Sequence, residues 1–319
     1  MIIAVSCAVL LIICISVALS LLKYHPSSLQ LQGKHVLITG ASSGIGFELS
    51  KLCAARGANV TMVARNKERL VSAESVVSRG CQHSNKVMSI SCDVSSSYDA
   101  IEDMVDKSVK SNGPIDILIC NAGICFPVEC AQAQPSQIKE SINVNLMGPC
   151  LLCKASLSKM SKPARIVLLS SQAGQIGLYG YSSYSPAKFG LLGLAQCLQM
   201  ELLKRDVHVT VAFPPDTNTP GYTEELKQAS KITQNISQRS GTMEPHNVAR
   251  KILDAAQNGK FACTFGINGL FLHIATSGAS PIYSYWEVIV QTLLAIPAKL
   301  SMCIANRSFY HLVDTAKDH

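Results

Sequence analysis

The chain has 319 residues, of which 48% are hydrophobic and only 15% are charged, and its formal net charge is +7. Its mean hydropathy of +0.23 is high for a soluble enzyme and favours association with a membrane. No basic run interleaved with aromatic residues occurs, so the positive charge does not indicate nucleic acid as a partner. It suits weak attraction to an anionic membrane surface.

Residues 1–22 contain no charged side chain. As a helix they would be about 33 Å long, enough to cross the apolar core of a bilayer. A secretory signal peptide, the alternative, normally begins with a positive segment, which is missing here. The first basic residues are Lys23 and Lys34, so the positive-inside rule places the following chain in the cytoplasm. We therefore predict a transmembrane anchor at 1–22, a linker at 23–32 and a catalytic domain at 33–260.

Residues 34–46 read KHVLITGASSGIG, an apolar strand candidate followed by a glycine turn and then a helical pattern. This order is the context of a dinucleotide-binding fingerprint. Gly40 allows a tight turn, Gly44 lets the backbone approach a pyrophosphate, and Gly46 lets the helix pack closely on the strand. The helix N-terminus then offers free N–H groups to phosphates. An ordinary glycine-rich turn is the alternative.

The second predicted strand, residues 59–64, is followed by Arg65 instead of an acidic residue. An acid at this position binds the ribose of NAD, whereas an arginine suits the extra phosphate of NADP through charge-assisted hydrogen bonds. Arg69, one turn further on, could assist, and Ser42 and Ser43 could also reach the phosphate. The pattern predicts NADPH as the cofactor, unless Arg65 is merely a solvated loop residue.

Two further strands are predicted at residues 87–92 and 115–120. The first ends at Asp93, which we expect beside the adenine. A helix predicted over residues 138–159 carries Asn145 among apolar neighbours. Asparagine is poor in a helix interior, and a buried amide must be hydrogen-bonded. Asn145 therefore indicates a polar network with the active site, or alternatively a purely structural role.

Residues 165–169 form a branched apolar run that predicts a buried strand ending at two serines, of which Ser171 is followed by Tyr184 thirteen residues later. Tyr184 and Lys188 are four residues apart on a predicted helix and share a face. A free phenol has a pKa of about 10, and a nearby cation favours the phenolate. The tyrosine can then exchange a proton with a carbonyl oxygen that the serine hydroxyl holds. Tyr-x-x-x-Lys alone also arises by chance on helix surfaces.

In this order and spacing, TGASSGIG, the NAG triplet from Asn121, Asn145, the serines and YSPAK resemble the short-chain dehydrogenase/reductase superfamily over most of the chain. The resemblance implies an α/β fold, a Rossmann-type doubly wound parallel sheet. It implies that Asn145 holds a relay water, that the serine orients the carbonyl and that Tyr184 is the acid/base. Lys188 binds the nicotinamide ribose and lowers the tyrosine pKa. By spacing the serine is Ser171, with Ser170 as the less favoured candidate.

The same resemblance implies a set of residues in contact with the cofactor. They are Gly40, Ser42, Ser43, Gly44, Ile45, Gly46, Arg65, Arg69, Asp93, Asn121, Tyr184, Lys188 and Thr219. Homodimers through the helices that carry Asn145 and Tyr184 are common in the superfamily, so the resemblance allows a homodimer without fixing the oligomeric state.

A longer stretch than usual, PPDTNTPG at residues 214–221, follows the sixth predicted strand. With SSQAGQIGLYGY before Tyr184, it resembles one branch of the superfamily, the reductases of 3-ketosphinganine. That resemblance implies NADPH-dependent reduction of a long-chain keto-lipid in sphingolipid synthesis, at the endoplasmic reticulum membrane and facing the cytosol. Pro186 departs from the branch but lies in a first helical turn, where proline is tolerated. The alternatives are a steroid or retinoid dehydrogenase and a non-catalytic NADPH-binding membrane protein.

Beyond residue 260 the composition becomes apolar, with stretches at 270–283 and 286–304 that are marginal for spanning a membrane. We predict that residues 261–319 are membrane-associated, as a re-entrant hairpin, two short tilted spans or an interfacial layer. An extension of the core or a dimer interface is the alternative.

The segment 221–245 is polar, and the superfamily places a lid over the substrate there. Its charged residues, Glu224 and Glu225 among them, are expected to be solvated. The 13 cysteines show no disulfide framework and are read as reduced core residues. Neither they nor the eight histidines have metal-ligand spacing, so no metal is predicted.

Overall fold

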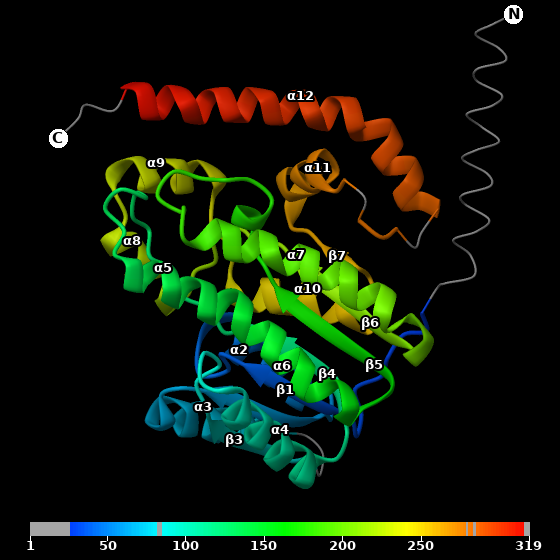
Figure 1. The fold of residues 1–319 in the computed structure, drawn as a ribbon. Coiled ribbons are helices and arrows are strands. Elements are labelled where there is room, and N and C mark those ends of the chain that lie inside the picture. Colours follow the sequence, from blue (N-terminus) through cyan, green and yellow to red (C-terminus); the bar gives the residue numbers. More distant parts are fainter. Residues whose placement is uncertain (1–25, 82–84, 279, 283–284, 316–319) are drawn as a thin grey trace, which may run out of the picture.

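The computed structural model describes residues 26–81, 85–278, 280–282 and 285–315. The predicted anchor at residues 1–22 lies outside these ranges. Within them, seven parallel strands form one sheet (Figure 1). The strands are β1 (His35–Thr39), β2 (Asn59–Ala64), β3 (Val87–Ser91), β4 (Ile115–Cys120), β5 (Met160–Leu169), β6 (Val207–Ala212) and β7 (Ala262–Cys263).

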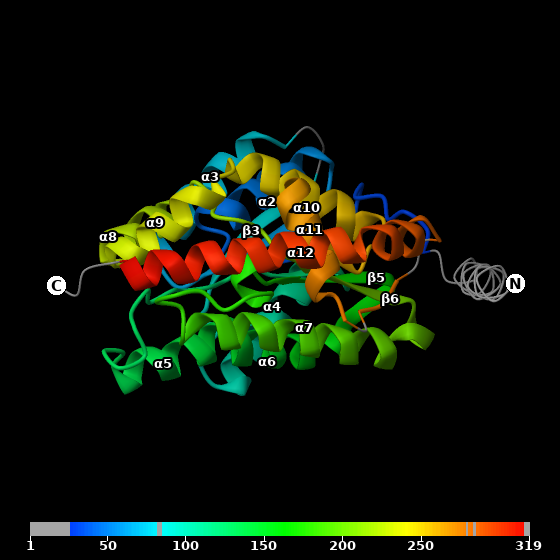
Figure 2. The ribbon, with the colours of Figure 1, turned by 90° about the horizontal axis from the view of Figure 1, so that it is seen from above.

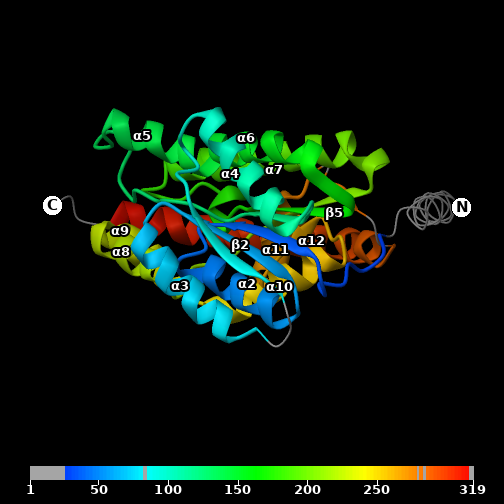
Figure 3. The ribbon, with the colours of Figure 1, turned by 90° about the horizontal axis from the view of Figure 1, so that it is seen from below.

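The strand order β3-β2-β1-β4-β5-β6-β7 is that of a doubly wound Rossmann-type sheet, as predicted. Every residue of β1, β4 and β6 is buried, because helices cover both faces of the sheet. Figures 2 and 3 show α2, α3 and α10 on one face and α4, α5, α6 and α7 on the other. The helices are α2 (Gly44–Ala55), α3 (Lys67–Arg79), α4 (Tyr98–Asn112), α5 (Pro135–Ile142), α6 (Gly148–Ser156), α7 (Tyr184–Glu201), α8 (Pro220–Gln228), α9 (Lys231–Ser240), α10 (Pro245–Gln257), α11 (Gly266–Thr276) and α12 (Tyr285–Thr315).

The helix predicted over residues 138–159 is not continuous. A π-helical turn at Asn143–Met147 separates α5 from α6. Such turns insert an extra residue into a helix and occur frequently at functional sites. Here the turn contains Asn145, whose side chain is completely buried.

The segment predicted as a linker, residues 23–32, packs on the domain where the structure describes it. Leu29 is buried, and its N–H donates to the carbonyl of Gln257 at 2.9 Å. The buried guanidinium of Arg165 donates to the carbonyl of Ser27 at 2.6 Å. These bonds tie the chain before β1 to β5 and α10.

The catalytic unit extends past residue 260, which corrects the predicted boundary. β7 pairs with β6 in parallel, so the sheet includes a strand from the segment assigned to the membrane. In α11, Leu272 and Ile274 are buried, and the ring of His273 lies 6.0 Å from that of Phe213. The part of the first apolar stretch that belongs to α11 therefore packs on the core, which is the alternative of a core extension.

The second apolar stretch belongs to α12, which continues through Pro297 as a single helix of 31 residues. It lies across the top of the domain in Figure 1, and one of its own residues, Ala298, is completely buried. Of the residues that the structure describes, only Trp286–Thr315 forms a helix long and apolar enough to cross a membrane.

Candidate active site

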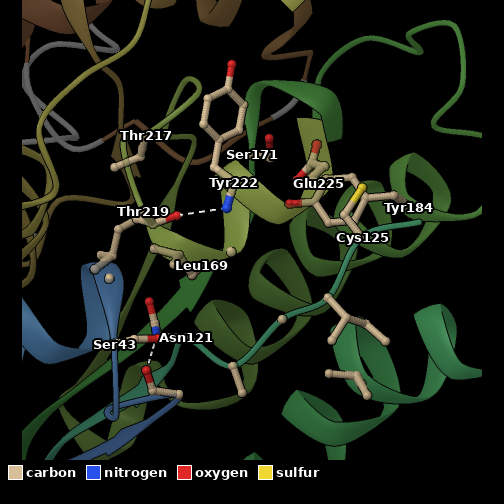
Figure 4. A pocket seen from close by; sticks show the side chains of 18 of the residues that line it. Ser43, Asn121, Cys125, Leu169, Ser171, Tyr184, Thr217, Thr219, Tyr222 and Glu225 are labelled. Atoms are coloured by element: carbon tan, nitrogen blue, oxygen red, sulfur yellow. Dashed lines mark hydrogen bonds between the residues drawn. The ribbon is translucent and has the colours of Figure 1, made fainter. Parts of the chain in front are cut away.

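A cleft of about 960 Å³ opens at the carboxyl ends of β1, β4, β5 and β6 (Figure 4). It includes the point between β1 and β4 where the strand order reverses, the usual ligand site of such sheets. The predicted catalytic and cofactor residues come together here with two exceptions, Gly46 and Asn145, which lie behind the cleft wall.

The glycine turn after β1 is shaped for close backbone contacts. Gly40 and Gly44 have φ angles of +66° and +58°, which favour glycine. A Cβ atom on Gly46 would lie 2.3 Å from the carbonyl oxygen of Gly40. Asn121 fixes the turn, because its Nδ2 donates to the carbonyls of Thr39 at 2.9 Å and Gly40 at 3.2 Å. Asn121 thus positions the glycine turn from the neighbouring strand.

The N-terminus of α2 points its free N–H groups at the cleft. Ser43 is the N-cap residue but makes no side-chain capping bond, and the first turn has no acidic residue. Ser42 and Ile45 line the cleft beside it. Thr219 packs opposite, 3.0 Å from where a Cβ of Gly44 would stand. A helix end of this kind suits an anion such as a pyrophosphate.

Arg65 and Arg69 line one end of the cleft. The side chain of Arg65 is 52% exposed, and its Nη1 lies 3.8 Å from Asp93 Oδ2 and 3.7 Å from Glu140 Oε1. Asp93 Oδ1 also accepts from the Ser95 N–H at 2.8 Å. Together with the glycine turn and the α2 N-terminus, these cations fit a dinucleotide with phosphates along the cleft.

Asn145 is held by two reciprocal bonds to one backbone residue. Its Nδ2 donates to the Ile124 carbonyl at 2.8 Å, and its Oδ1 accepts from the Ile124 N–H at 3.2 Å. Nδ2 also donates to the Ser141 carbonyl at 2.9 Å, one turn earlier. Asn145 therefore fixes the loop after β4 that forms the cleft wall.

The two serines after β5 have different partners. The buried Ser170 donates its hydroxyl to the Lys188 carbonyl at 2.8 Å and so secures α7 to the strand. Ser171 Oγ accepts from the Ala173 N–H at 3.2 Å and lies close enough to the Tyr184 hydroxyl to oppose the rise of its pKa. The serine beside the phenol is Ser171, the one that the spacing favours.

Lys188 is buried beneath Tyr184. Its Nζ donates to the Leu169 carbonyl at 2.9 Å and lies 5.4 Å from the centre of the Tyr184 ring. Burial disfavours the charged ammonium and lowers the pKa of Lys188 to about 8.

The pKa of Tyr184 is raised, mainly by burial and further by Cys125 and Glu225, while Ser171 opposes the shift. The pKa of Tyr184 is thus raised on balance, whereas the resemblance implied that Lys188 lowers it, and the dominant cause is desolvation of the buried phenol. A raised pKa keeps the phenol protonated, the state needed to donate a proton to a carbonyl oxygen.

Three residues beside Tyr184 were missed as site residues in the sequence. Tyr181 OH donates to Glu225 Oε1 at 2.6 Å, and its ring lies 5.9 Å from that of Tyr184. Glu225, expected to be solvated, instead faces Cys125 inside the cleft. The sequence signal for Tyr181 is its position three residues before Tyr184, which brings it close to the predicted site. Glu225 and Cys125 come from distant segments and carry no sequence signal.

Helices α8 and α9 close one side of the cleft where a lid was expected. Asp216 accepts hydrogen bonds from the hydroxyls of Tyr222, at 3.2 Å, and Ser237. Thr219 caps α8 by accepting from the Tyr222 N–H at 3.1 Å. The two helices are thus joined through one carboxylate at the cleft wall.

The fold and this site define a class of protein. Residues 34–230 match the model of the short chain dehydrogenase family, and the chain belongs to that family of oxidoreductases. Members of the family bind NAD or NADP, in agreement with the shape of the cleft.

The similar proteins narrow the class further. The chain is 39% identical to a 3-dehydrosphinganine reductase of Danio rerio, over 83% of this chain and 81% of the relative. It is 38% identical to one of Arabidopsis thaliana, over 91% and 88%. A 3-ketodihydrosphingosine reductase of Bos taurus is 36% identical, over 84% and 82%.

Solved structures confirm the fold. A dehydrogenase/reductase of Sinorhizobium meliloti is 26% identical with a TM-score of 0.65, over 74% of this chain and 94% of its own. A short chain dehydrogenase/reductase of Burkholderia phymatum in complex with NAD is 20% identical, with a TM-score of 0.66 over 74% and 89%.

The burial of Lys188 predicts the alkaline limit of activity. Its ammonium is charged below a pKa of about 8 and neutral above it. We expect kcat/KM for ketone reduction to fall above about pH 8, because that parameter reports ionisations of the free enzyme. Burial raises the pKa of the Tyr184 phenol, so we assign this limb to Lys188. A profile that stays flat to pH 10 in initial-rate measurements would contradict the assignment.

Proposed function

We propose that this protein reduces 3-ketosphinganine to sphinganine with NADPH. The observation that carries the proposal is the grouping of Ser171, Tyr184 and buried Lys188 at the end of β5, in a chain similar to 3-dehydrosphinganine reductases. The agreement of site and relatives favours this substrate over a steroid or a retinoid.

The residues of the chain divide the reaction between them. Ser171 and Tyr184 hydrogen-bond the ketone oxygen, and Tyr184 donates its proton to that oxygen as the alcohol forms. Lys188 would bind the nicotinamide ribose. Asn145 would hold the water through which protons are relayed. The bound nicotinamide supplies a hydride. Holding the two reactants in contact accounts for much of the rate.

NADPH is preferred over NADH because of Arg65 and Arg69. A guanidinium forms paired, charge-assisted hydrogen bonds with a phosphate, and the exposed Arg65 side chain is free to swing toward one. Its neighbours Asp93 and Glu140 are too distant, at 3.8 and 3.7 Å, to hold it in a tight ion pair.

The substitution Arg65→Asp should reverse the cofactor preference. It removes the phosphate ligand and adds a repelling charge, so KM for NADPH should rise on the order of tenfold or more, while KM for NADH changes little. Steady-state kinetics with both cofactors measure this. Arg79→Asp, the same charge change at the exposed end of α3, is the matched control. An unchanged preference in Arg65→Asp would refute the role of this residue.

The protein works on a membrane surface. One side of α12 packs on the domain, while the other exposes an apolar stripe at helical spacing, formed by Trp286, Ile289, Leu293, Ile296, Leu300 and Ile304. A helix with one face on protein and the other apolar suits the bilayer interface better than a crossing. Such a position lets a lipid substrate reach the cleft without entering water.

The cellular location of the protein is inferred from the sequence and from the cysteines that the structure describes. We place the protein at the endoplasmic reticulum membrane, anchored by residues 1–22, with the domain in the cytosol. The cysteines that the structure describes are all free thiols, as a reducing compartment favours. A homodimer through α7 and the segment from α5 to the π-helical turn is proposed as well, because Ile138, Met147 and Phe189 are exposed there.

The activity is tested with detergent-solubilised full-length protein, NADPH and three ketones: 3-ketosphinganine, a steroid ketone and retinal. Oxidation of NADPH with 3-ketosphinganine alone is expected. It should fall at least about a thousandfold in Tyr184→Phe, since the proton donor is lost, while NADPH binding is retained. Turnover of only the steroid ketone or of retinal would overturn the assignment of 3-ketosphinganine as the substrate. NADPH binding without any turnover would favour a scaffold protein.

A further inference from the structure

The substrate side of the cleft contains a carboxylate that has no cationic partner among the described residues. Glu225 on α8 is half-buried, accepts a hydrogen bond from Tyr181 OH at 2.6 Å and faces the thiol of Cys125. Among the residues that the structure describes, no lysine, arginine or histidine forms an ion pair with it. Both of its protein partners are neutral.

Glu225 is also close to the reacting group. Its charge acts directly on the phenol of Tyr184, which it helps to keep protonated. Figure 4 shows Glu225 and Cys125 next to Tyr184, away from Ser43 and Asn121 at the dinucleotide end of the cleft. The carboxylate of Glu225 therefore lies in the part of the cleft that the dinucleotide would not fill and that the substrate would occupy.

This arrangement is costly without a ligand. Removing a carboxylate from water disfavours its charged form, and burial accordingly raises the pKa of Glu225. The neighbouring Asp216 adds a like charge and raises it further. Lys188 forms no ion pair with Glu225, and its Nζ donates to the Leu169 carbonyl instead. A cation on the substrate would supply the missing partner of the carboxylate.

We propose that Glu225 binds the ammonium group of an amino-ketone substrate and so selects it over ketones that lack an amine. The inference rests on the proposed function: in 3-ketosphinganine the amino group is on the carbon next to the ketone, two bonds from the carbonyl carbon. A group that binds this nitrogen must be near the group that binds the carbonyl oxygen. Glu225 next to Tyr184 meets that requirement.

Glu225 is a specificity residue in this account, and Tyr181 is its positioning residue. The hydrogen bond from Tyr181 OH holds the carboxylate in the cleft while one oxygen remains available. Charge-assisted hydrogen bonds to an ammonium are stronger than those to neutral donors, so the amine adds affinity as well as orientation. Steroid and retinoid ketones make no such contact.

The test compares two substrates on two enzymes. The substrates are 3-ketosphinganine and its deamino analogue, which has hydrogen in place of the amine. In the wild type, kcat/KM should favour the amine. Glu225→Gln keeps the shape but removes the charge, and should lower kcat/KM for the amine roughly 30-fold, mainly through KM, with at most about a threefold change for the analogue.

The matched control is Glu201→Gln, the same change at the exposed last residue of α7, which does not line the cleft. It should leave both substrates unaffected. NADPH affinity and the melting temperature of Glu225→Gln should equal those of the wild type, which shows that the fold is intact.

An equal loss on both substrates, or no loss on either, would overturn the role of Glu225 while leaving the reductase assignment in place. If the wild-type enzyme reduces neither ketone, the proposed function itself fails, and the ammonium site fails with it. The two failures are therefore distinguishable in one set of assays.

Discussion

The burial of a single ammonium group governs the geometry of the site. Lys188 is only 4% exposed, and an ammonium taken from water must find acceptors. The carbonyl of Leu169, at the end of β5, supplies one, and Ser170 returns a bond to the carbonyl of Lys188. These two bonds lock the first turn of α7 against the strand. Tyr184, one turn before Lys188, is thereby fixed over the cleft.

The opposite wall is fixed by amides instead of charges. Asn121 ties the glycine turn after β1 to the end of β4, and Asn145 ties the next part of the same loop to the π-helical turn. Both asparagines use backbone groups as partners. The cofactor end and the chemical end of the cleft therefore share one rigid loop, and a change at either asparagine is expected to disturb both.

Much of this could be predicted because the signals were local. The strand–glycine–helix unit and the spacing from Ser171 to Lys188 predict the doubly wound parallel sheet and the position of the site. Features that depend on distant contacts could not be predicted: the inward turn of Glu225 needs Tyr181 and α8 to meet, and the raised pKa of Tyr184 results from burial. Hydropathy alone also could not tell α11 as a core helix from a membrane segment, since the two have the same composition.

The central claim is that this chain transfers hydride to a lipid ketone while Tyr184 protonates the oxygen. The most direct measurement uses NADPH deuterated at the transferable position, full-length protein in detergent and 3-ketosphinganine, with mass spectrometry of the product. The account predicts sphinganine with one deuterium on the carbinol carbon, and none formed by Tyr184→Phe. Sphinganine without deuterium, or no product from an enzyme that binds the nucleotide, would contradict it.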